Sequence, residues 1–221
     1  MTKTFCILSL ILIPALFIAP DQIFGEEKDL MNLPEPRLKG NVSVEEAINN
    51  RRSVRNYAPK KIDVASISQL LWAAQGITDK SRGFRSTPSA GALYPLEIYL
   101  VKDEGIYHYI PDGHKLELVS DKNVKKALVK AAHNQAFISE ADIDIIVCGV
   151  YERAAVRYGD RAVRYTDMEA GHLAQNVFLQ AIALGLDSVA IGAFSDSAVS
   201  EIVGLPKNSK PLYILPVGYK K

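Results

Sequence analysis

One apolar segment sets the strongest limit on the fold of this chain. Residues 143–150 read Ile-Asp-Ile-Ile-Val-Cys-Gly-Val. The segment is rich in β-branched side chains, and it is much shorter than the ~20 apolar residues that cross a membrane as a helix. A strand that is apolar on both faces needs cover on both faces. The sequence therefore predicts a central strand in a sheet with helices around it.

Hydrophobic periodicity and capping residues predict the elements around this strand. Ser43 and Glu46 form a capping box, and Asp63 and Asp121 stand as N-caps ahead of helical segments. The sequence predicts helices at residues 43–50, 62–74, 121–132, 165–184 and 196–203, with one further helical turn at 135–140. It predicts strands at residues 96–101, 105–110, 116–119, 143–150, 188–191 and 212–217.

This mixture of elements predicts an α+β fold with one main sheet. The helix expected at residues 165–184 is the longest, and its apolar side chains nearly encircle it. Such a helix lies either at the centre of a large domain or in a subunit interface. The length of the chain suits a single domain, and we find no internal repeat or domain boundary. The interface is therefore favoured.

The N-terminal region has the pattern of a targeting segment. A single charge, Lys3, precedes an apolar run over residues 5–19, and Gly25 offers a small residue before a mainly acidic stretch. This is the pattern of a secretory signal peptide, which predicts export to the periplasm or the outside of the cell. An uncleaved N-terminal membrane anchor is the alternative. The predicted organisation is a signal peptide or anchor at residues 1–25, a lead-in segment at 26–42, and a cofactor-binding domain at 43–221.

Composition excludes several classes of function. The formal net charge is +1, and no basic tract exists beyond residues 51–55, so we expect no nucleic-acid partner. Cys148 is the only cysteine after residue 25, and its apolar surroundings predict a buried strand thiol. The four histidines show no spacing typical of a metal site, so we expect no bound metal.

Three short segments, far apart in the sequence, suit the binding of a flat cofactor that carries a phosphate. Residues 51–57 read Arg-Arg-Ser-Val-Arg-Asn-Tyr and offer three guanidinium groups and a hydroxyl to a dianion. Residues 87–95 and 190–194 are small turns that contain glycine. A backbone of this kind can approach a ring closely and offer its own N–H and C=O groups.

Taken together, these segments resemble the nitroreductase family of flavoproteins, and within it the branch of azoline-oxidising dehydrogenases from peptide natural-product clusters. The resemblance covers residues 42–219, nearly the whole domain. Its most specific motif is Pro-Ser-Ala-Gly-Ala-Leu-Tyr-Pro at residues 88–95. The other motifs are Arg-Arg-Ser-Val-Arg at 51–55, Arg-Tyr-Gly-Asp-Arg at 157–161, Glu-Ala-Gly-His at 169–172, Gly-Leu at 185–186, Ile-Gly-Ala-Phe at 191–194 and Pro-Val-Gly at 216–218.

The resemblance implies a mostly antiparallel central sheet flanked by helices, and a homodimer with FMN at the subunit interface. The ribityl phosphate and pyrimidine edge would be held by Arg51, Arg52, Ser53 and Arg55. The partner subunit would cover the isoalloxazine ring with Pro88, Ser89, Ala90 and Gly91. The segment beneath the ring near N5 would be Ala190, Ile191, Gly192 and Ala193, and Gln135 would supply an amide that reaches the flavin.

The implied activity is two-electron (hydride) transfer through flavin N5, to or from a small organic substrate. Tyr158 and Arg157 are the candidate catalytic residues. Azoline-oxidising relatives carry a Lys-Tyr pair where this chain has Arg157-Tyr158, and an arginine cannot easily act as a general base. Relatives also draw basic residues from a C-terminal tail, where this chain has only Lys220 and Lys221.

Several alternatives stay open. The electron donor is a small molecule, NAD(P)H being one possibility, and the residues allow either direction of reaction. Export would separate the protein from the cytosolic nicotinamide pool. This favours another donor or, less strongly, an N-terminal anchor with the domain in the cytosol. The rival function is a non-catalytic FMN-binding module or a partner subunit of a complex.

Overall fold

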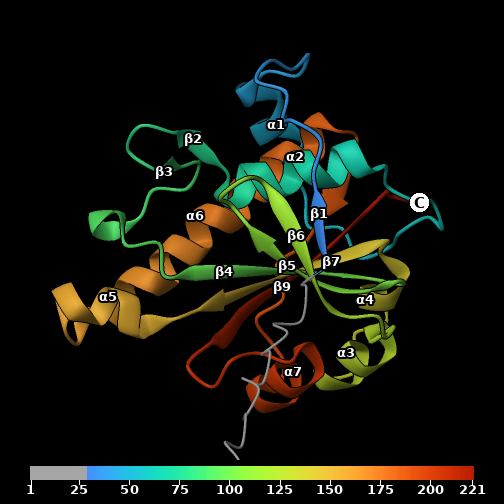
Figure 1. The fold of residues 1–221 in the computed structure, drawn as a ribbon. Helices are drawn as coiled ribbons and strands as arrows, with labels where there is room; N and C mark the ends of the chain where they lie inside the picture. Colours follow the sequence, from blue (N-terminus) through green and yellow to red (C-terminus); the bar gives the residue numbers. More distant parts are fainter. Residues whose placement is uncertain (1–28) are drawn as a thin grey trace, which may run out of the picture.

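A seven-stranded sheet lies between two layers of helices in the computed structural model, which describes residues 29–221 (Figure 1). Every pair of neighbouring strands in this sheet is antiparallel, which confirms the α+β prediction of a central antiparallel sheet flanked by helices. The strand order is β1 (Leu30–Asn32), β6 (Lys115–Ser120), β5 (Gly105–Ile110), β4 (Leu96–Lys102), β7 (Ile143–Gly149), β9 (Lys210–Gly218) and β8 (Asp187–Ser188). A separate ribbon pairs β2 (Ile77–Asp79) with β3 (Phe84–Arg85).

Strand β7 is the central strand that the sequence predicts. All seven of its residues are buried, and it pairs with β4 on one side and β9 on the other. Its alternate side chains enter two different apolar clusters: Ile145 and Val147 face one helix layer, while Ile146 and Cys148 face the other. Cys148 is a buried free thiol, as predicted. The two helix layers therefore cover both apolar faces of β7.

Helices α2 (Val64–Gln75) and α6 (Arg161–Ala183) cover one face of the sheet. Asp63 caps α2 by accepting a hydrogen bond from the N–H of Ser66, as the sequence predicts. Helix α6 buries Leu173 and Val177 in this core, but Val163 and Met168 stay about half exposed. The fold of one chain therefore leaves apolar surface on α6 uncovered.

Three shorter helices cover the opposite face: α3 (Lys125–Ala131), α4 (Phe137–Glu140) and α7 (Asp196–Val203). The bounds of α7 match the prediction. Asp121 is not the N-cap of α3, contrary to the prediction, because β6 extends to Ser120 and the helix begins only at Lys125. The side chain of Asn123 instead accepts a hydrogen bond from the Lys125 N–H at 3.2 Å.

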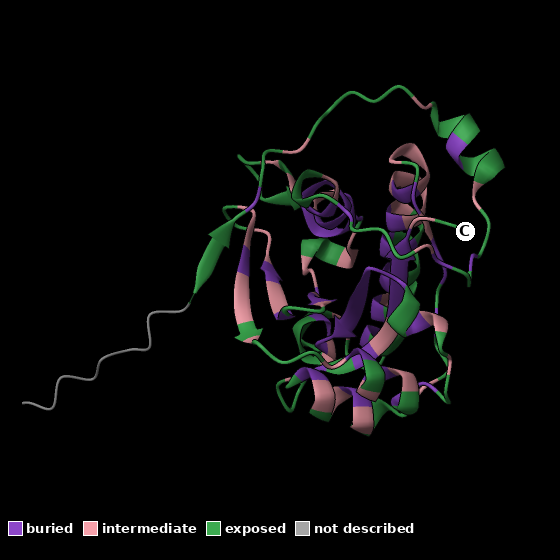
Figure 2. Cartoon of the chain, turned by 90° about the vertical axis from the view of Figure 1, so that its right-hand side faces the viewer, coloured by how far each residue is buried: buried purple, intermediate pink, exposed green. Residues whose placement is uncertain are grey.

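The remaining helices lie around the edges. Helix α1 (Val44–Asn50) is capped by Ser43 as predicted and follows an exposed stretch of chain (Figure 2). The 3₁₀ helix η1 (Ala90–Ala92) lies in the loop that precedes β4. The sequence does not predict helix α5 (Tyr151–Tyr158), which is short, rich in charged residues and buries only Ala154. Helix α6 also begins earlier than predicted, at Arg161, and the predicted strand at 188–191 is reduced to β8 and a bridge from Ile191 to Ile214.

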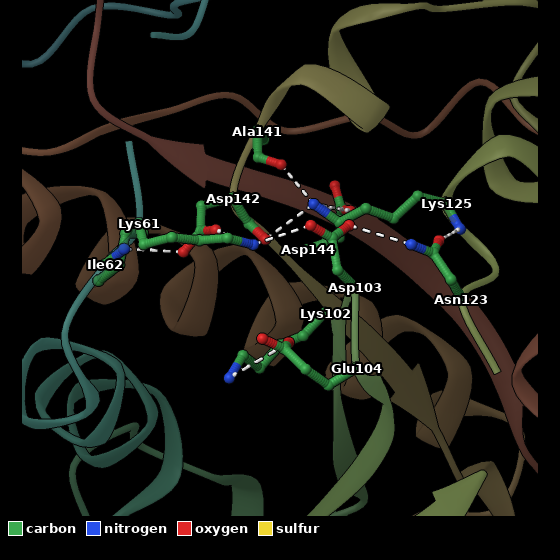
Figure 3. Close-up of polar contacts among 10 residues, drawn as sticks. All are labelled: Lys61, Ile62, Lys102, Asp103, Glu104, Asn123, Lys125, Ala141, Asp142 and Asp144. Atoms are coloured by element: carbon green, nitrogen blue, oxygen red, sulfur yellow. Dashed lines mark hydrogen bonds and ion pairs between the residues drawn. The ribbon is translucent and has the colours of Figure 1, made fainter. Parts of the chain in front are cut away.

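A partly buried cluster of charged side chains joins α3 to the sheet (Figure 3). The Nζ of Lys125, a residue only 3 % exposed, donates to the carbonyl oxygens of Ala141 and Asp142. It lies 4.0 Å from the Asp144 carboxylate on β7, which is fully buried. Lys61 completes the cluster by pairing with Asp142 at 3.1 Å. The cluster fixes the start of α2 and α3 against the same end of β7.

Residues 1–28 lie outside the described part of the chain, so the signal peptide or anchor at residues 1–25 stays a prediction. Within residues 29–221, no helix combines the length and the apolar character that crossing a membrane requires. The same residues contain no group of histidine, cysteine and acidic side chains arranged to hold a metal ion. Part of the predicted lead-in segment, residues 30–32, adds strand β1 to the edge of the sheet.

Candidate functional site

The arginine-rich segment after α1 is fixed to the edge of the main sheet. Its backbone pairs with the β8 strand, where the N–H of Val54 donates to the Ser188 carbonyl at 3.2 Å and Ser53 forms a bridge with Ser188. Further along, the N–H of Ala58 donates to the carbonyl of Tyr219 at 2.7 Å. The segment therefore holds a defined course on the surface.

Tyr57 is the anchor of this segment. It is 1 % exposed, and its phenol donates to the carbonyls of Val54 at 2.8 Å and Pro216 at 3.2 Å. Burial raises the pKa of the Tyr57 phenol, so it stays a hydrogen-bond donor. The ring packs on Gly218, where an added Cβ would come within 2.9 Å of it. A glycine at 218 is what allows this close approach.

The cationic side chains of the segment point toward solvent. Arg52 and Arg55 are exposed and Arg51 is half-buried. Arg52 donates to the backbone carbonyls of Asn49 and Arg51, both at 2.8 Å, and Arg55 lies over the ring of Phe137. Among the described residues, none of these three guanidinium groups forms an ion pair with a carboxylate. Their charge is therefore available to an anionic ligand.

The C-terminal residues run beside this segment. The N–H of Lys221 donates to the Asn56 carbonyl at 3.2 Å, and Tyr57 forms a bridge with Lys220. Burial raises the pKa of the Asp187 carboxyl, and the Lys220 ammonium opposes that rise, so Lys220 lies near β8. The side chain of Lys221 instead pairs with Glu140 at 3.7 Å. The basic tail residues thus lie at the same sheet edge as the arginines.

The predicted ring-contacting segment, residues 190–193, is held by one buried side chain. Ile191 is 3 % exposed and exchanges two backbone hydrogen bonds with Ile214 on β9, at 2.9 and 3.0 Å. Ala190, Gly192 and Ala193 are exposed. This alternation presents a strip of small residues, with its backbone, on the surface.

Gln135 lies against the same segment. Its Nε2 donates to the carbonyl of Ala193 at 3.1 Å and to that of Ala132 at 3.0 Å. The two residues before it, His133 and Asn134, both have a positive φ, which turns the chain sharply after α3. The fold therefore brings together an amide and a segment that are 58 residues apart.

The predicted ring-covering segment, residues 88–91, is a tight turn supported from below. The Ser89 hydroxyl accepts a hydrogen bond from the Tyr94 N–H at 2.9 Å. Just before it, the fully buried Thr87 donates to the Ala74 carbonyl at 2.6 Å and accepts from Asn176 at 3.2 Å. These contacts tie the turn to both α2 and α6.

Gly91 brings the two candidate catalytic residues into this turn. Its φ is +61°, a conformation that favours glycine. A Cβ at this position would lie 2.8 Å from the Tyr158 phenol oxygen and 2.9 Å from Nη1 of Arg157. The end of α5 therefore packs directly on the turn, and residues 157 and 158 belong to the same local site as residues 88–91.

Sequence reasoning named Glu169 only as part of a family motif and gave this titratable residue no role in the site. It lies on the buried side of α6, is 2 % exposed, and accepts from Nε2 of Gln75 at 3.4 Å. Burial raises the pKa of the Glu169 carboxyl to about 7, while the Ser89 hydroxyl, Gln75 and the Arg85 charge oppose that rise. Its signal in the sequence is an acidic residue within an apolar helical stripe.

The predicted site residues form two groups in one chain. The first group contains residues 51–55, 135 and 190–193; the second contains residues 88–91, 157 and 158. Residues 51–55 pair with β8, beyond the C-terminal end of α6, whereas Gly91 packs near its N-terminal end (Figure 1). Helix α6 has 23 residues, a length of about 35 Å. One chain does not bring the arginine segment to the ring-covering turn.

Comparison with known proteins gives the family. The model described as "Nitroreductase family" matches residues 48–219, most of the chain. The chain belongs to the nitroreductase family. A nitroreductase relative from Methanocaldococcus jannaschii, MJ1384, is 43% identical over 198 residues, which cover 87% of this chain and 98% of the relative. The NADPH-flavin oxidoreductase of Vibrio harveyi is 33% identical over 109 residues, 46% of this chain and 45% of that protein.

Solved structures show the same nitroreductase fold. A nitroreductase from Ralstonia eutropha aligns with a TM-score of 0.80 and 24% identity, covering 97% of both chains. The Escherichia coli microcin synthetase complex McbBCD, with truncated pro-MccB17 bound, contains a chain that aligns with a TM-score of 0.68 and 26% identity. This alignment covers 96% of the present chain and 85% of the other. The likeness to a peptide-processing enzyme agrees with the branch that the sequence resembles.

Proposed function

We propose that this nitroreductase-family protein is an FMN-dependent oxidoreductase that transfers two electrons, as a hydride, to or from a small organic substrate. One observation carries the proposal. Three guanidinium groups, at Arg51, Arg52 and Arg55, lie together without a carboxylate partner among the described residues, on a segment anchored by Tyr57. A basic cluster held in place in this way suits the phosphate of a mononucleotide.

The residues present fit FMN beyond its phosphate. The exposed backbone of residues 190–193, with Gln135 beside it, offers a flat strip of small residues against which a ring can lie. The turn at residues 88–91 offers a second small surface. When bound, FMN would supply the two-electron chemistry at N5, while the protein orients the substrate and excludes water.

We further propose that the functional unit is a homodimer. The arginine segment and the ring-covering turn lie near opposite ends of α6. A second copy running in the opposite direction would place the turn of one subunit over the arginine segment of the other. The half-exposed apolar side chains of Val163 and Met168 on α6 suit burial in such an interface. Each flavin site would then combine residues from both subunits.

The residues beside the turn would act on the substrate. The Tyr158 phenol lies at Gly91 and can donate a hydrogen bond to a bound substrate atom. Arg157 stays protonated, so its role is electrostatic rather than that of a proton acceptor. Gly91 keeps both groups close to the ring-covering backbone. The substrate would therefore lie between residues 157–158 and the face of the ring.

The similarity to a subunit of the McbBCD complex favours a second candidate function. In this alternative the chain is a subunit of a larger complex and binds FMN there, whether or not it catalyses a reaction itself. The name of the Vibrio harveyi relative favours NADPH as the electron donor in the enzymatic reading. We also propose that residues 1–25 either direct export of the domain as a signal peptide or anchor it in the membrane.

The absorption spectrum of the purified protein tests the proposed cofactor. The chromophore is released by heat and identified by its mass, and one FMN per chain is the expected result. Reduction by NADPH followed by reoxidation with a nitro-aromatic or a quinone then separates an enzyme from a non-catalytic module. A colourless protein that takes up no added FMN would contradict the proposal.

A further inference from the structure

Three arginine side chains reach the loop that holds the ring-covering turn, and two of them are already occupied. Arg85 donates to the Gln75 side chain at 3.3 Å and lies over the ring of Tyr94, 4.5 Å from its centre. Arg153 forms an ion pair with the half-buried Glu97 and donates to the Tyr94 carbonyl. The charges of these two arginines therefore support the loop itself.

Arg157 differs from both of them. It is exposed, and no carboxylate of residues 29–221 forms an ion pair with it. Its guanidinium lies over the ring of Tyr158, 5.5 Å from the centre, and its Nη1 lies against Gly91 beside the Tyr158 phenol oxygen. Two hydrogen-bond donors, one of them charged, thus converge at the turn.

The surroundings of Arg157 add positive charge. Tyr158 and Tyr165 meet edge to face at 5.1 Å, which packs the last turn of α5 against the first turns of α6. Arg161 and Arg164 lie on those first turns, are exposed, and form no ion pair with a carboxylate of the described residues. Asp160 and Asp167 also lie nearby in the chain, but Asp167 accepts a hydrogen bond from Tyr151. The free charge at the turn itself is that of Arg157.

An arginine next to a substrate has two conceivable roles, that of a general base and that of an anion-binding group. A general base needs to lose its proton near neutral pH, which arginine does not do. A charged fork with a neighbouring phenol instead matches a planar anion, to which it donates several hydrogen bonds at once. The chemistry of Arg157 and Tyr158 thus fits the recognition of an anion, not the removal of a proton.

We propose that the substrate of this site carries an anionic group, a carboxylate or a phosphate, that Arg157 and Tyr158 bind beside Gly91. This inference rests on the proposed function, because it places the substrate at the ring-covering turn. It goes beyond that function in naming the class of substrate. The anion can belong either to the organic acceptor or to a phosphorylated nicotinamide donor, and the two sources share the same chemistry.

Isothermal titration calorimetry of the full chain, as purified, tests the proposal without requiring turnover. One pair of ligands is 4-nitrobenzoate and 4-nitrobenzamide, which have nearly the same shape but differ in charge. A second pair is NADP⁺ and NAD⁺, which differ in one phosphate and cannot reduce the flavin. We expect the wild-type protein to bind the more negatively charged member of at least one pair more tightly. Whichever pair shows the preference identifies the source of the anion.

Substitutions at Arg157 connect the preference to this residue. Arg157→Gln should weaken binding of the preferred anion about tenfold to a hundredfold and leave the neutral or less charged ligand within about twofold. Arg157→Lys should keep part of the preference, because it keeps the charge but loses the fork. Arg82→Gln is the matched control, since Arg82 is an exposed arginine paired with Asp79 in the β2–β3 loop. It should leave every affinity unchanged.

Two results would overturn the proposal: equal binding, or none, within both wild-type pairs, or a preference that survives in Arg157→Gln. Flavin content, measured on the same samples, is read separately. A protein without flavin would contradict the proposed oxidoreductase function. The calorimetric preference would still show whether residue 157 binds anions. The two failures are therefore distinguishable.

Discussion

Single buried side chains hold the three surface segments of the candidate site in place. Tyr57 joins the arginine segment to β9 through one hydrogen bond to the Pro216 carbonyl and a close contact with Gly218, and its phenol also donates to Val54 within the segment. Ile191 does the same for residues 190–193, and Thr87 for the ring-covering turn. In each segment a buried residue holds a stretch whose other members are mostly exposed or half-buried.

The first prediction concerns the phenol of Tyr57. Tyr57→Phe leaves the buried carbonyls of Val54 and Pro216 without this donor, so the free energy of unfolding should fall by about 1–3 kcal/mol. Urea denaturation followed by circular dichroism measures the change. Tyr107→Phe is the control, because its half-buried phenol has no hydrogen-bond partner among the described residues. Equal stability of Tyr57→Phe and wild type would refute the anchoring role.

The second prediction concerns the proposed phosphate site. Arg51→Ala and Arg55→Ala should each weaken FMN binding by roughly 1.5–3 kcal/mol, because each removes a charge-assisted contact. Quenching of flavin fluorescence during titration measures the dissociation constant. Arg82→Ala provides the control for loss of an exposed arginine elsewhere. If both variants purify with a full complement of flavin, the phosphate lies in another place.

The third prediction is a pH dependence that comes from Glu169. Its pKa is raised to about 7 in the folded protein by burial, above its ordinary value of 4.5. The folded state therefore holds a proton that the unfolded state has released, and the free energy of unfolding should fall as pH rises from about 4.5 to about 7. Above that range its contribution is constant. The groups that face this carboxyl are Gln75, Ser89 and Arg85.

Glu169→Gln supplies the test, since it keeps the shape of the side chain but cannot ionise. The variant should lose this part of the pH dependence in denaturation curves collected between pH 5 and pH 8. Glu201→Gln, at an exposed position on α7, should behave as the wild type. Identical pH profiles for Glu169→Gln and the wild type would show that Glu169 does not titrate in this range.

At the scale of elements, α6 and the turn at η1 make most of the contacts that connect the core to the site. Helix α6 buries Leu173 and Val177 in the core, holds Thr87 through Asn176, and presents Glu169 beneath Ser89. Helix α5 then closes on the turn through Arg157 and Tyr158. Because the turn contacts both helices, a change at Gly91 acts on the whole local site.

The fourth prediction is made at this turn. Gly91→Val forces an L side chain into a left-handed conformation and drives its Cβ into Tyr158 and Arg157, so flavin binding should be lost while the fold stays intact. Absorbance at the flavin bands and far-ultraviolet circular dichroism measure the two outcomes. Gly83→Val is a close control: Gly83 also has a positive φ, +68°, but has no atom within 4 Å of an added Cβ. A yellow Gly91→Val protein would contradict the ring-covering role.

At the scale of the whole molecule, the two groups of site residues lie near opposite ends of the longest helix. This separation follows from the strand register: the turn at η1 leads into the start of β4, level with Gly149 and Lys210, whereas β8 pairs with the far end of β9, at Val217 and Gly218. The homodimer that we propose would unite the groups. The exposed apolar residues on α6 give its two subunits a surface to bury.

The fifth prediction concerns this assembly. Met168→Glu places a charge on the half-exposed apolar surface of α6, so it should convert a dimer into monomers and reduce flavin content at the same time. Size-exclusion chromatography with light scattering measures the mass. Val119→Glu, on the exposed side of β6, is the control and should leave the mass unchanged. A wild-type protein that is monomeric with bound flavin would refute the composite site.

Prediction from the sequence succeeded where the signal is local and strong. The apolar run at 143–150 gave the central strand, and Ser43 and Asp63 gave two helix starts. It failed at α5, a short helix that is rich in charged residues and buries only Ala154. It also failed to give Glu169 a role, because the pKa of an acidic side chain depends on the residues that pack around it.

The sequence by itself determined the types of secondary structure, the family of the chain, and the chemical groups available to a cofactor. The elements and the available groups follow from periodicity, capping and composition, which act between neighbours in the chain, and the family follows from motifs that resemble nitroreductases. Only the tertiary structure decided which groups meet: Gln135 with Ala193, and Gly91 with Arg157 and Tyr158. Such contacts depend on how helices pack on the sheet, and packing joins residues that no local pattern connects.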